Sequence, residues 1–466
     1  MIPIDTIVAP ATPPGRSALA IVRIDGPAAS SILASLTRSA PPAVRHAALV
    51  KLLSVVSCQL SVPSGEESQT TENRQPTTAE SIDEAIAIRY EAPHSFTGND
   101  LVELTLHGNP LLVSRVIEAC VELGARMAEP GEFTERAVLN GKMDLVQAES
   151  IADLINARTA LQAKLSLSNL EGTLSRKAAA IRQVLLEVIS RLEAALDFSE
   201  EGYEFITRDE VTTRLSAALR EVASMAETYR RGRATRTGLS AVILGRPNAG
   251  KSTLLNRLVG SDRAIVTPIP GTTRDIVRET IEIGGLPVIL ADTAGLRETA
   301  DVVEDIGVAR AREAARTADI ILYLVDSTIG LTPEDEAELA ALENVQLVFT
   351  KADLTPTRQP PTVNRQPPLA ISAVSDEGMD ALLARLDELV REQYVAPEGA
   401  LVNERQRLAV AECEEALRAA LASSDLDEQM ILVDLYRAAN ALGTLTGAIT
   451  RNEILSEIFD QFCIGK

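Results

Sequence analysis

Residues Gly245 to Ser252 read GRPNAGKS, a complete G-x-x-x-x-G-K-S phosphate loop. The apolar run Ala241 to Leu244 precedes the loop and the helix-forming stretch Thr253 to Leu258 follows it. Small residues at this spacing let successive backbone N–H groups curl around phosphates. We therefore predict a nucleoside triphosphate site in which Lys251 reaches the outer phosphates and the Ser252 hydroxyl binds Mg²⁺. The expected nucleotide contacts here are Asn248, Ala249, Gly250, Lys251, Ser252 and Thr253.

Two more nucleotide motifs follow in order. Gly271 to Asp275 reads GTTRD and suits a first switch, in which Thr273 places its hydroxyl on Mg²⁺ and its N–H on the γ-phosphate. Asp292 to Gly295 reads DTAG and closes the apolar strand Pro287 to Ala291, which sets a carboxylate near Mg²⁺. Together these motifs predict a nucleotide switch. Its expected contacts are Gly271, Thr272, Thr273, Asp292, Thr293, Ala294 and Gly295.

The base is expected to be guanine. Thr350-Lys351-Ala352-Asp353 ends the strand-like run Val345 to Phe349, and one carboxylate accepts two hydrogen bonds from the guanine N1–H and N2–H₂ edge. Asn usually occupies the first position of this motif, so Thr350 weakens the guanine assignment without removing Asp353. Ser372 and Ala373, after the short run Leu369 to Ile371, supply a last base-contacting turn.

Composition bounds the rest of the chain. With 466 residues, 45% of them hydrophobic, the chain has material for two or three domains. No apolar run approaches about 18 residues and Met1 to Asp5 lacks a basic signal start, so we expect a soluble, cytoplasmic protein with no membrane segment. Four scattered cysteines and three scattered histidines argue against disulfides and a zinc site. The net charge of −21 restricts any RNA contact to a local patch.

The texture of the sequence changes along the chain. Residues 1–140 mix strand-like runs with a helical stretch, which predicts an α+β domain. Residues 141–236 and 397–466 carry apolar stripes at helical spacing that neither piece can bury alone, so we expect one discontinuous helical domain. Residues 237–396 form the Ras-like P-loop domain inserted between them, with a mainly parallel sheet. Polar stretches at 62–80 and 355–368 are expected to be inserted loops.

One basic cluster stands where the chain enters the nucleotide domain. Arg230, Arg231, Arg233 and Arg236 fit either an RNA patch or, better, a solvated linker between domains. The motifs also fit two rival functions, a ribosome-assembly GTPase and a small-molecule kinase. A kinase does not need the Thr350 to Asp353 motif, and an assembly factor is expected to carry a basic RNA-binding domain.

Several stretches spread over the whole chain stand out together with the nucleotide motifs. They are DTIVAPATPPGR at Asp5 to Arg16, PGEFTERA at Pro130 to Ala137, LVQAESIADLI at Leu145 to Ile155, GRPNAGKST, GTTRD, DTAGLRE and the terminal Cys463-Ile464-Gly465-Lys466. In these stretches, which include both termini, the chain resembles the MnmE (TrmE) family of bacterial tRNA modification GTPases. The resemblance implies a homodimer that works with an FAD-containing MnmG-type partner. Their joint product is an aminomethyl or carboxymethylaminomethyl group at C5 of the wobble uridine of certain tRNAs, with the carbon taken from a folate.

The same resemblance implies site residues that spacing alone does not reveal. It assigns 5-formyltetrahydrofolate to Arg23, Glu103, Lys142 and Lys466. Because Leu296 stands where many GTPases carry a water-positioning Gln, it assigns hydrolysis to Glu304 acting through water. A K⁺ ion is implied to supply the positive charge near the phosphates, with Arg274 and Arg297 as alternative charge donors, and Cys463 is a further candidate thiol. The implied K⁺ ligands are Asn248, Thr267, Ile269 and Thr272.

Overall fold

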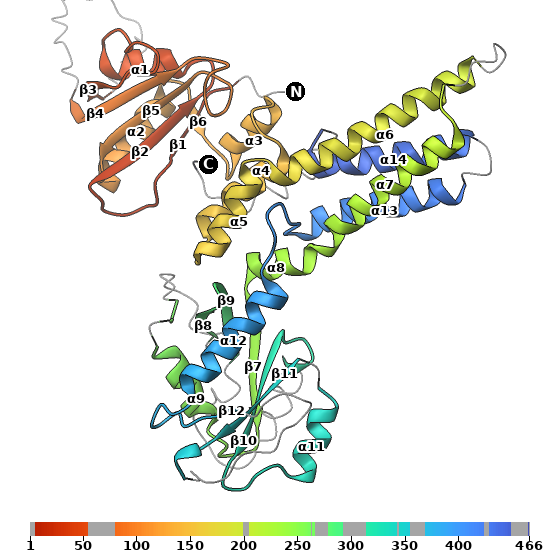
Figure 1. Cartoon of the computed structure of the whole chain (residues 1–466). Helices are drawn as coiled ribbons and strands as arrows, with labels where there is room; N and C mark the ends of the chain where they lie inside the picture. The colour runs from red at the N-terminus through yellow and green to blue at the C-terminus, as the bar shows by residue number, and fades with distance from the viewer. Residues whose placement is uncertain are drawn as a thin grey trace, which may run out of the picture. The chain divides into compact units, whose positions relative to one another are not determined.

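The computed structural model describes residues 5–54, 80–198, 205–261, 263–265, 278–291, 314–342, 344–354, 369–423, 428–448 and 465. The chain divides into two compact units (Figure 1). The N-terminal unit comprises Met1–Ala152 and Gly447–Lys466, and the central unit comprises Asp153–Thr446. The central unit is therefore inserted into the sequence of the other.

A six-stranded sheet, the N-terminal sheet, organises the first unit, in the order β3-β4-β5-β2-β1-β6. All pairs are antiparallel except β1 with β6. The strands are β1 (Ile7–Pro10), β2 (Leu19–Asp25), β3 (Ala48–Leu53), β4 (Ser81–Tyr90), β5 (Leu101–His107) and β6 (Arg126–Met127). The helices are α1 (Ala29–Thr37), α2 (Pro110–Glu122), α3 (Glu132–Leu139) and α4 (Leu145–Asn156), the last of which crosses into the central unit. The expected α+β architecture is confirmed.

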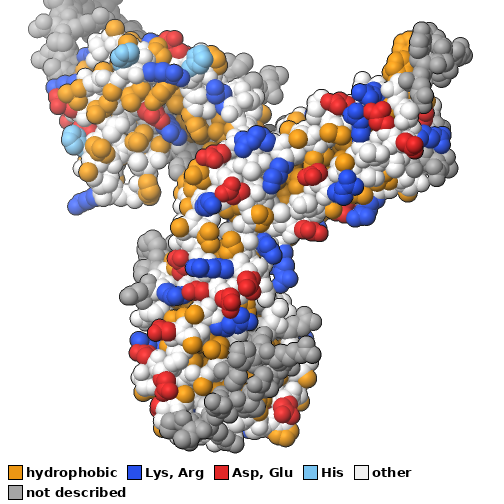
Figure 2. Space-filling view, viewed as in Figure 1, with side chains coloured by type: hydrophobic (Ala, Val, Ile, Leu, Met, Phe, Trp, Pro, Cys, Tyr) orange, Lys and Arg blue, Asp and Glu red, His pale blue; other side chains and the backbone are white. Residues whose placement is uncertain are grey.

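Side chains alternate between the two faces of this sheet. One face carries Val22, Ile24 and Leu104, which pack with α1 and α2 into a dry core. On the other face, Leu49 is 73% exposed and lies directly opposite Ile86, which is 44% exposed. Leu49 and Ile86 thus form an uncovered apolar part of the N-terminal sheet. Figure 2 shows hydrophobic side chains in orange on this unit, and orange side chains also lie on the rest of the visible face.

A four-helix bundle forms the helical part of the central unit. Helix α6 packs on α7 and α14, and α13 packs on α7 and α14. The apolar stripe expected within residues 141–236 runs Ile181, Leu185, Val188, Leu192 and Leu196, since a helix repeats every 3.6 residues and returns these positions to one face. Its first four members are buried on α6, and Leu196 is half-buried. The bundle elements and the preceding helix are α5 (Ala160–Leu170), α6 (Thr173–Asp197), α7 (Arg208–Glu227), α13 (Glu404–Ala422) and α14 (Glu428–Thr446).

A second six-stranded sheet, the nucleotide sheet, has the order β12-β11-β10-β7-β9-β8 and is parallel except for β8 with β9. Helices α9 and α12 cover one face and α11 lies on the other, so the strands are buried on both sides and read as continuous apolar runs. The elements are β7 (Leu239–Gly245), α9 (Lys251–Val259), β8 (Arg278–Ile283), β9 (Leu286–Ala291), β10 (Ile320–Asp326), α11 (Pro333–Ala340), β11 (Val345–Thr350), η1 (Ala352–Leu354), β12 (Leu369–Ala370) and α12 (Met379–Tyr394). This is the expected mainly parallel P-loop domain.

The basic cluster lies on helix α8 (Tyr229–Thr237). The expected linker is helical, and Arg230, Arg231 and Arg233 are exposed on it. Arg236 instead pairs with Asp153 at 2.6 Å, and the Arg230 guanidinium lies 5.4 Å from the centre of the Tyr394 ring. Helix α8 also touches α12 where the chain leaves the nucleotide sheet: the Thr235 hydroxyl accepts a hydrogen bond from the Ala396 N–H at 3.2 Å and donates to the Tyr394 carbonyl at 3.4 Å. The segment by which the chain enters the nucleotide-binding domain, at Thr235, and the segment by which it leaves, at Ala396, therefore lie side by side.

Within the described ranges, no helix combines the length and the apolar character needed to cross a membrane.

Candidate functional site

The phosphate loop joins β7 to α9 through three residues with positive φ. Gly245 has φ +135°, and a Cβ there would lie 2.3 Å from the Leu324 carbonyl oxygen of β10, so only glycine fits. Gly250 caps α9 at φ +89°, and Asn248 adopts φ +62°, a region that asparagine tolerates. The positive φ angles at Gly245, Asn248 and Gly250 therefore set the path of the loop, and each is occupied by a residue that tolerates such an angle.

The first turn of α9 points its N-terminal end toward the loop. Lys251, Ser252 and Thr253 form that turn, and the Ser252 and Thr253 side chains are exposed. The Lys251 ammonium folds back over the loop and donates to the carbonyls of Gly245 at 2.9 Å and Arg246 at 2.8 Å. N–H groups, a helix N-terminus and an ammonium together suit an anion, and the exposed serine hydroxyl suits Mg²⁺ beside it.

The residues predicted to contact the base lie next to this loop because β10 and β11 run parallel to β7. Thr350 ends β11 and donates its hydroxyl to the Ala249 carbonyl of the phosphate loop at 2.8 Å. Lys351 has φ +58° and its ammonium lies 2.7 Å from an Asp326 oxygen at the end of β10. Partial burial opposes ionisation of Asp326, but the hydrogen bonds from Lys351 and Thr328 prevail and lower its pKa.

Asp353 and the Ser372 turn complete this region. Asp353 is exposed on η1. The Ala352 N–H donates to the Ile371 carbonyl at 3.1 Å, which places the turn after β12 against the turn after β11. Ser372 is buried and its hydroxyl accepts hydrogen bonds from the N–H groups of Val374 and Ser375, while Ala373 is half-exposed. The structure therefore brings together the phosphate loop, Thr350, Asp353 and the Ser372 turn.

The remaining predicted nucleotide residues lie outside the described residues. They are Thr267, Ile269, Gly271, Thr272, Thr273, Arg274, Asp292, Thr293, Ala294, Gly295, Arg297 and Glu304. The predicted folate residue Lys466 and the candidate thiol Cys463 also lie outside the described residues.

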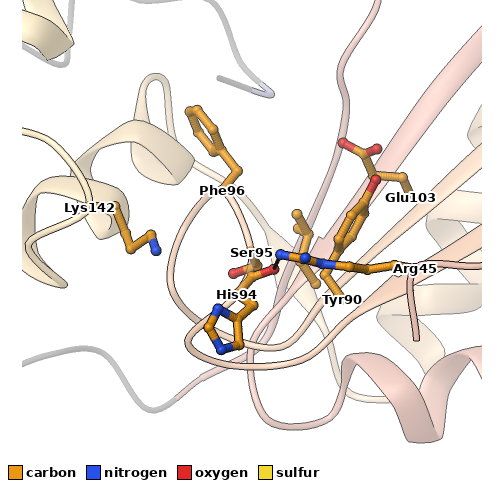
Figure 3. Close-up of a pocket in the computed structure, with 8 residues that line it drawn as sticks. Arg45, Tyr90, His94, Ser95, Phe96, Glu103 and Lys142 are labelled. Carbon is orange, nitrogen blue, oxygen red and sulfur yellow. Dashed lines mark hydrogen bonds between the residues drawn. The ribbon is translucent and has the colours of Figure 1, made fainter.

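A second pocket, of about 360 Å³, lies on the N-terminal sheet at the ends of β4 and β5 (Figure 3). Glu103 and Lys142, two of the predicted folate residues, line it. The third, Arg23, faces Glu103 directly across the β2–β5 pair, and the two form an ion pair of 2.9 Å. Cross-strand register thus explains their contact. The pocket size falls in the range of small-molecule sites.

Several lining residues were not predicted. Tyr90 approaches Glu103, and burial together with the charge and hydrogen bond of that carboxylate raises the pKa of Tyr90. The Arg45 guanidinium donates to the His94 carbonyl at 3.1 Å, and the Lys142 ammonium donates to the Pro93 carbonyl at 3.0 Å. No sequence motif marks these residues, because two strands, β4 and β5, and three separate loop segments bring them together. The other lining residues are His94, Ser95, Phe96 and Leu101.

The tail reaches the N-terminal unit at Gly465. This glycine is buried at φ +97°, and a Cβ there would lie 1.9 Å from the Pro10 carbonyl oxygen. A side chain at this position would therefore displace the backbone after β1. Gly465 belongs to the Cys-Ile-Gly-Lys tail, so the backbone of that tail contacts the strand that neighbours β2.

The fold and the first of these sites define a P-loop GTPase. The family profile described as "MnmE helical domain" matches residues 145–463, and that described as "GTP-binding protein TrmE N-terminus" matches residues 6–142. The chain belongs to the MnmE family of tRNA modification GTPases, as the resemblance in its motifs predicted.

Relatives named "tRNA modification GTPase MnmE" match over nearly the whole chain. The protein from Symbiobacterium thermophilum is 42% identical, that from Nitrosomonas europaea 40% and that from Koribacter versatilis 39%, each over 99% of both chains. Among solved structures, Era from Aquifex aeolicus is 27% identical over 38% of this chain and 66% of its own, with a TM-score of 0.24.

Proposed function

We propose that this chain is a K⁺-dependent, homodimeric GTPase that modifies C5 of the wobble uridine of certain tRNAs in the cytoplasm, together with an FAD-containing MnmG-type partner and a folate one-carbon donor. The observation that carries the proposal is the meeting of the phosphate loop with Thr350 and Asp353 in a chain of the MnmE family. GTP is the substrate, and Mg²⁺ would be held by Ser252 and Thr273.

Hydrolysis is assigned to residues of this chain in two roles. Glu304 orients the attacking water, because Leu296 has no group that can do so. K⁺ supplies positive charge near the phosphates when bound, with Asn248, Thr267, Ile269 and Thr272 as its ligands. Asn248 supports this role because its side chain is exposed on the phosphate loop at φ +62°.

The cation assignment is tested by GTP turnover in KCl and in NaCl at equal ionic strength. We expect much faster turnover in KCl. Asn248→Ala should reduce the difference between the two salts, whereas Glu304→Ala should slow turnover in both while nucleotide affinity stays nearly unchanged. Equal rates of the unaltered protein in the two salts would refute the K⁺ role.

The folate proposal rests on the charges of the second pocket. A pterin edge offers paired donors for a carboxylate, and Arg23 and Tyr90 hold Glu103 in place for it. Lys142 suits the anionic glutamate tail, with Lys466 as the further cation that the family implies. Calorimetry with 5-formyltetrahydrofolate should show loss of binding in Glu103→Gln and no loss in Glu84→Gln, an exposed carboxylate on the same face of the sheet. Equal affinity of both variants would refute the assignment.

The apolar part of the N-terminal sheet supports the homodimer. Leu49 and Ile86 are paired across β3 and β4 and remain exposed. Contiguous exposed apolar surface is uncommon on monomeric proteins and typically marks a protein–protein interface. Leu49→Lys should shift the protein toward the monomer in analytical ultracentrifugation. Glu122→Lys, an exposed change on α2 at the other face of the sheet, is the control.

The tRNA reaction is tested in cells that lack this protein. Their tRNA should lose the C5 group at the wobble uridine, and the unaltered chain should restore it. Unchanged tRNA would favour the ribosome-assembly alternative.

A further inference from the structure

Thr350 fills the first position of the Thr-Lys-Ala-Asp motif, where Asn is usual, and its side chain is engaged inside the protein. The residue is only 5% exposed. Its hydroxyl donates to the Ala249 carbonyl at 2.8 Å, and the Val325 carbonyl is the next acceptor at 3.3 Å. Thr350 therefore ties the end of β11 to the phosphate loop on one side and to β10 on the other.

The number of donors decides what else this side chain can do. A threonine hydroxyl carries one hydrogen, whereas an asparagine amide carries two N–H donors. Both oxygens near the Thr350 hydroxyl are backbone carbonyls, which only accept. The single donor is consequently used within the protein, and none is left for a bound base. An asparagine at this position would keep a second donor after satisfying the Ala249 carbonyl.

Guanine presents different groups on different edges. Its N1–H and N2–H₂ donate and match the exposed Asp353 carboxylate, while its N7 only accepts and needs a protein donor. Asp353 and Thr350 lie on the same turn, three residues apart in sequence. The division of roles between them follows from their chemistry: the carboxylate can read the donor edge, and the engaged hydroxyl cannot read N7.

We propose that Thr350 is a positioning residue for the phosphate loop that leaves purine N7 unread, so that guanine is selected without a hydrogen bond from this position. The inference rests on the proposed GTP site and adds how its base is selected. It predicts a nucleotide pocket tolerant of changes at N7 and sensitive to changes at the N1 and N2 edge.

The test is calorimetry of the full chain with Mg²⁺ and three nucleotides: GDP, 7-deaza-GDP, which lacks the N7 acceptor, and IDP, which lacks the 2-amino group. The unaltered protein should bind GDP and 7-deaza-GDP within about twofold of each other, and IDP about tenfold more weakly than GDP because a hydrogen bond to a carboxylate is lost. The IDP result shows that the assay detects a base contact when one exists.

Variants at the same position separate positioning from base reading. Thr350→Val keeps the shape and removes the donor, so it should weaken GDP and 7-deaza-GDP by the same factor, about fivefold, through the unsupported Ala249 carbonyl. Thr350→Ser keeps the hydroxyl and should stay near the unaltered protein, which assigns the effect of Thr350→Val to the lost hydroxyl. The proposal is overturned if Thr350→Val changes the ratio of the two affinities or leaves GDP affinity intact. Failure of the unaltered protein to bind GDP would instead refute the GTP site itself.

Discussion

Replacing Arg136 by Met should destabilise the N-terminal unit severely, because this arginine lies at the centre of a buried charge cluster. Its side chain is 1% exposed and lies 3.1 Å from Asp25, 2.7 Å from Asp5 and 2.8 Å from Glu132. Arg126 also pairs with Asp5 and Glu132, so without Arg136 only Asp25 loses its cation completely.

The expected magnitude follows from that carboxylate. Asp25 is fully buried and would keep hydrogen bonds only from Thr97 and Asn99. Removing one partner of a buried ion pair costs about 3 to 5 kcal/mol, since the other charge remains without compensation. Arg115→Met is the matched control, because Arg115 pairs with Glu80 at 2.8 Å on the surface and such pairs contribute about 0 to 1 kcal/mol.

The pH dependence gives a second readout. Burial raises the pKa of Asp25, the usual direction for a carboxyl group removed from water, although Thr97, Asn99 and Arg136 oppose it. A carboxyl group whose pKa is higher in the folded than in the unfolded state contributes its full stabilisation of the fold at pH below its unfolded pKa of 3.8. That stabilisation is lost as the pH rises through the folded-state pKa. In Arg136→Met the arginine no longer lowers the pKa of Asp25, so burial should raise that pKa further. The loss of folding stability should therefore grow with pH, and adding Asp25→Asn should recover part of it.

Hydrogen exchange of β1, β2 and α3 amides in the full chain measures this stability without unfolding the central unit. We expect protection of these amides to fall by several powers of ten in Arg136→Met and to stay near normal in Arg115→Met. Similar protection in the two variants would refute the reasoning.

Three further outcomes follow from other contacts. Gly285 has φ +88° and a Cβ there would lie 2.4 Å from Leu161, so Gly285→Ala should cost about 2 kcal/mol in urea unfolding, and adding Leu161→Ala should recover only the steric part. Burial raises the pKa of the Cys120 and Cys413 thiols to about 12, so both should resist iodoacetamide at pH 8 until the protein is denatured, as mass spectrometry would show. Burial favours the neutral form of Asp387, but an arginine and a backbone N–H outweigh it and lower its pKa. The unaltered protein should therefore be more stable than Asp387→Asn by about 1 kcal/mol in urea titrations. This difference in folding stability should be full above pH 3.8 and shrink below it.

The nucleotide sheet was largely predictable from sequence, because its strands are buried on both faces and follow one another in the order of the motifs. Val345 to Phe349 and Pro287 to Ala291 are apolar runs that became β11 and β9. The helical stripes were less predictable: Leu408 stands at helical spacing in the apolar stretch that became α13, which predicts burial, yet it is 54% exposed. A period of 3.6 residues indicates one face of a helix, but not how wide the contact with its neighbours will be.

The second pocket could not have been assembled from the sequence without the resemblance. Arg23 and Glu103 meet because β2 and β5 pair in one register, and Tyr90 joins them from β4. A register shift of one residue would send each side chain to the other face of the sheet, and no local pattern of the strands fixes it. The Thr350 contact with Ala249 is similar, since it depends on the parallel order of β7, β10 and β11.

The hydrogen bond from Ala396 to Thr235 has a practical consequence for protein engineering. Because the chain enters and leaves the nucleotide-binding segment within one hydrogen bond of the same hydroxyl, a short glycine tether could join the two cut points. The segment could then be removed, or exchanged like a cassette for the corresponding segment of another GTPase, while the bundle helices keep their connections. Such chimaeras would show whether the chemistry and the scaffold evolved as separable parts.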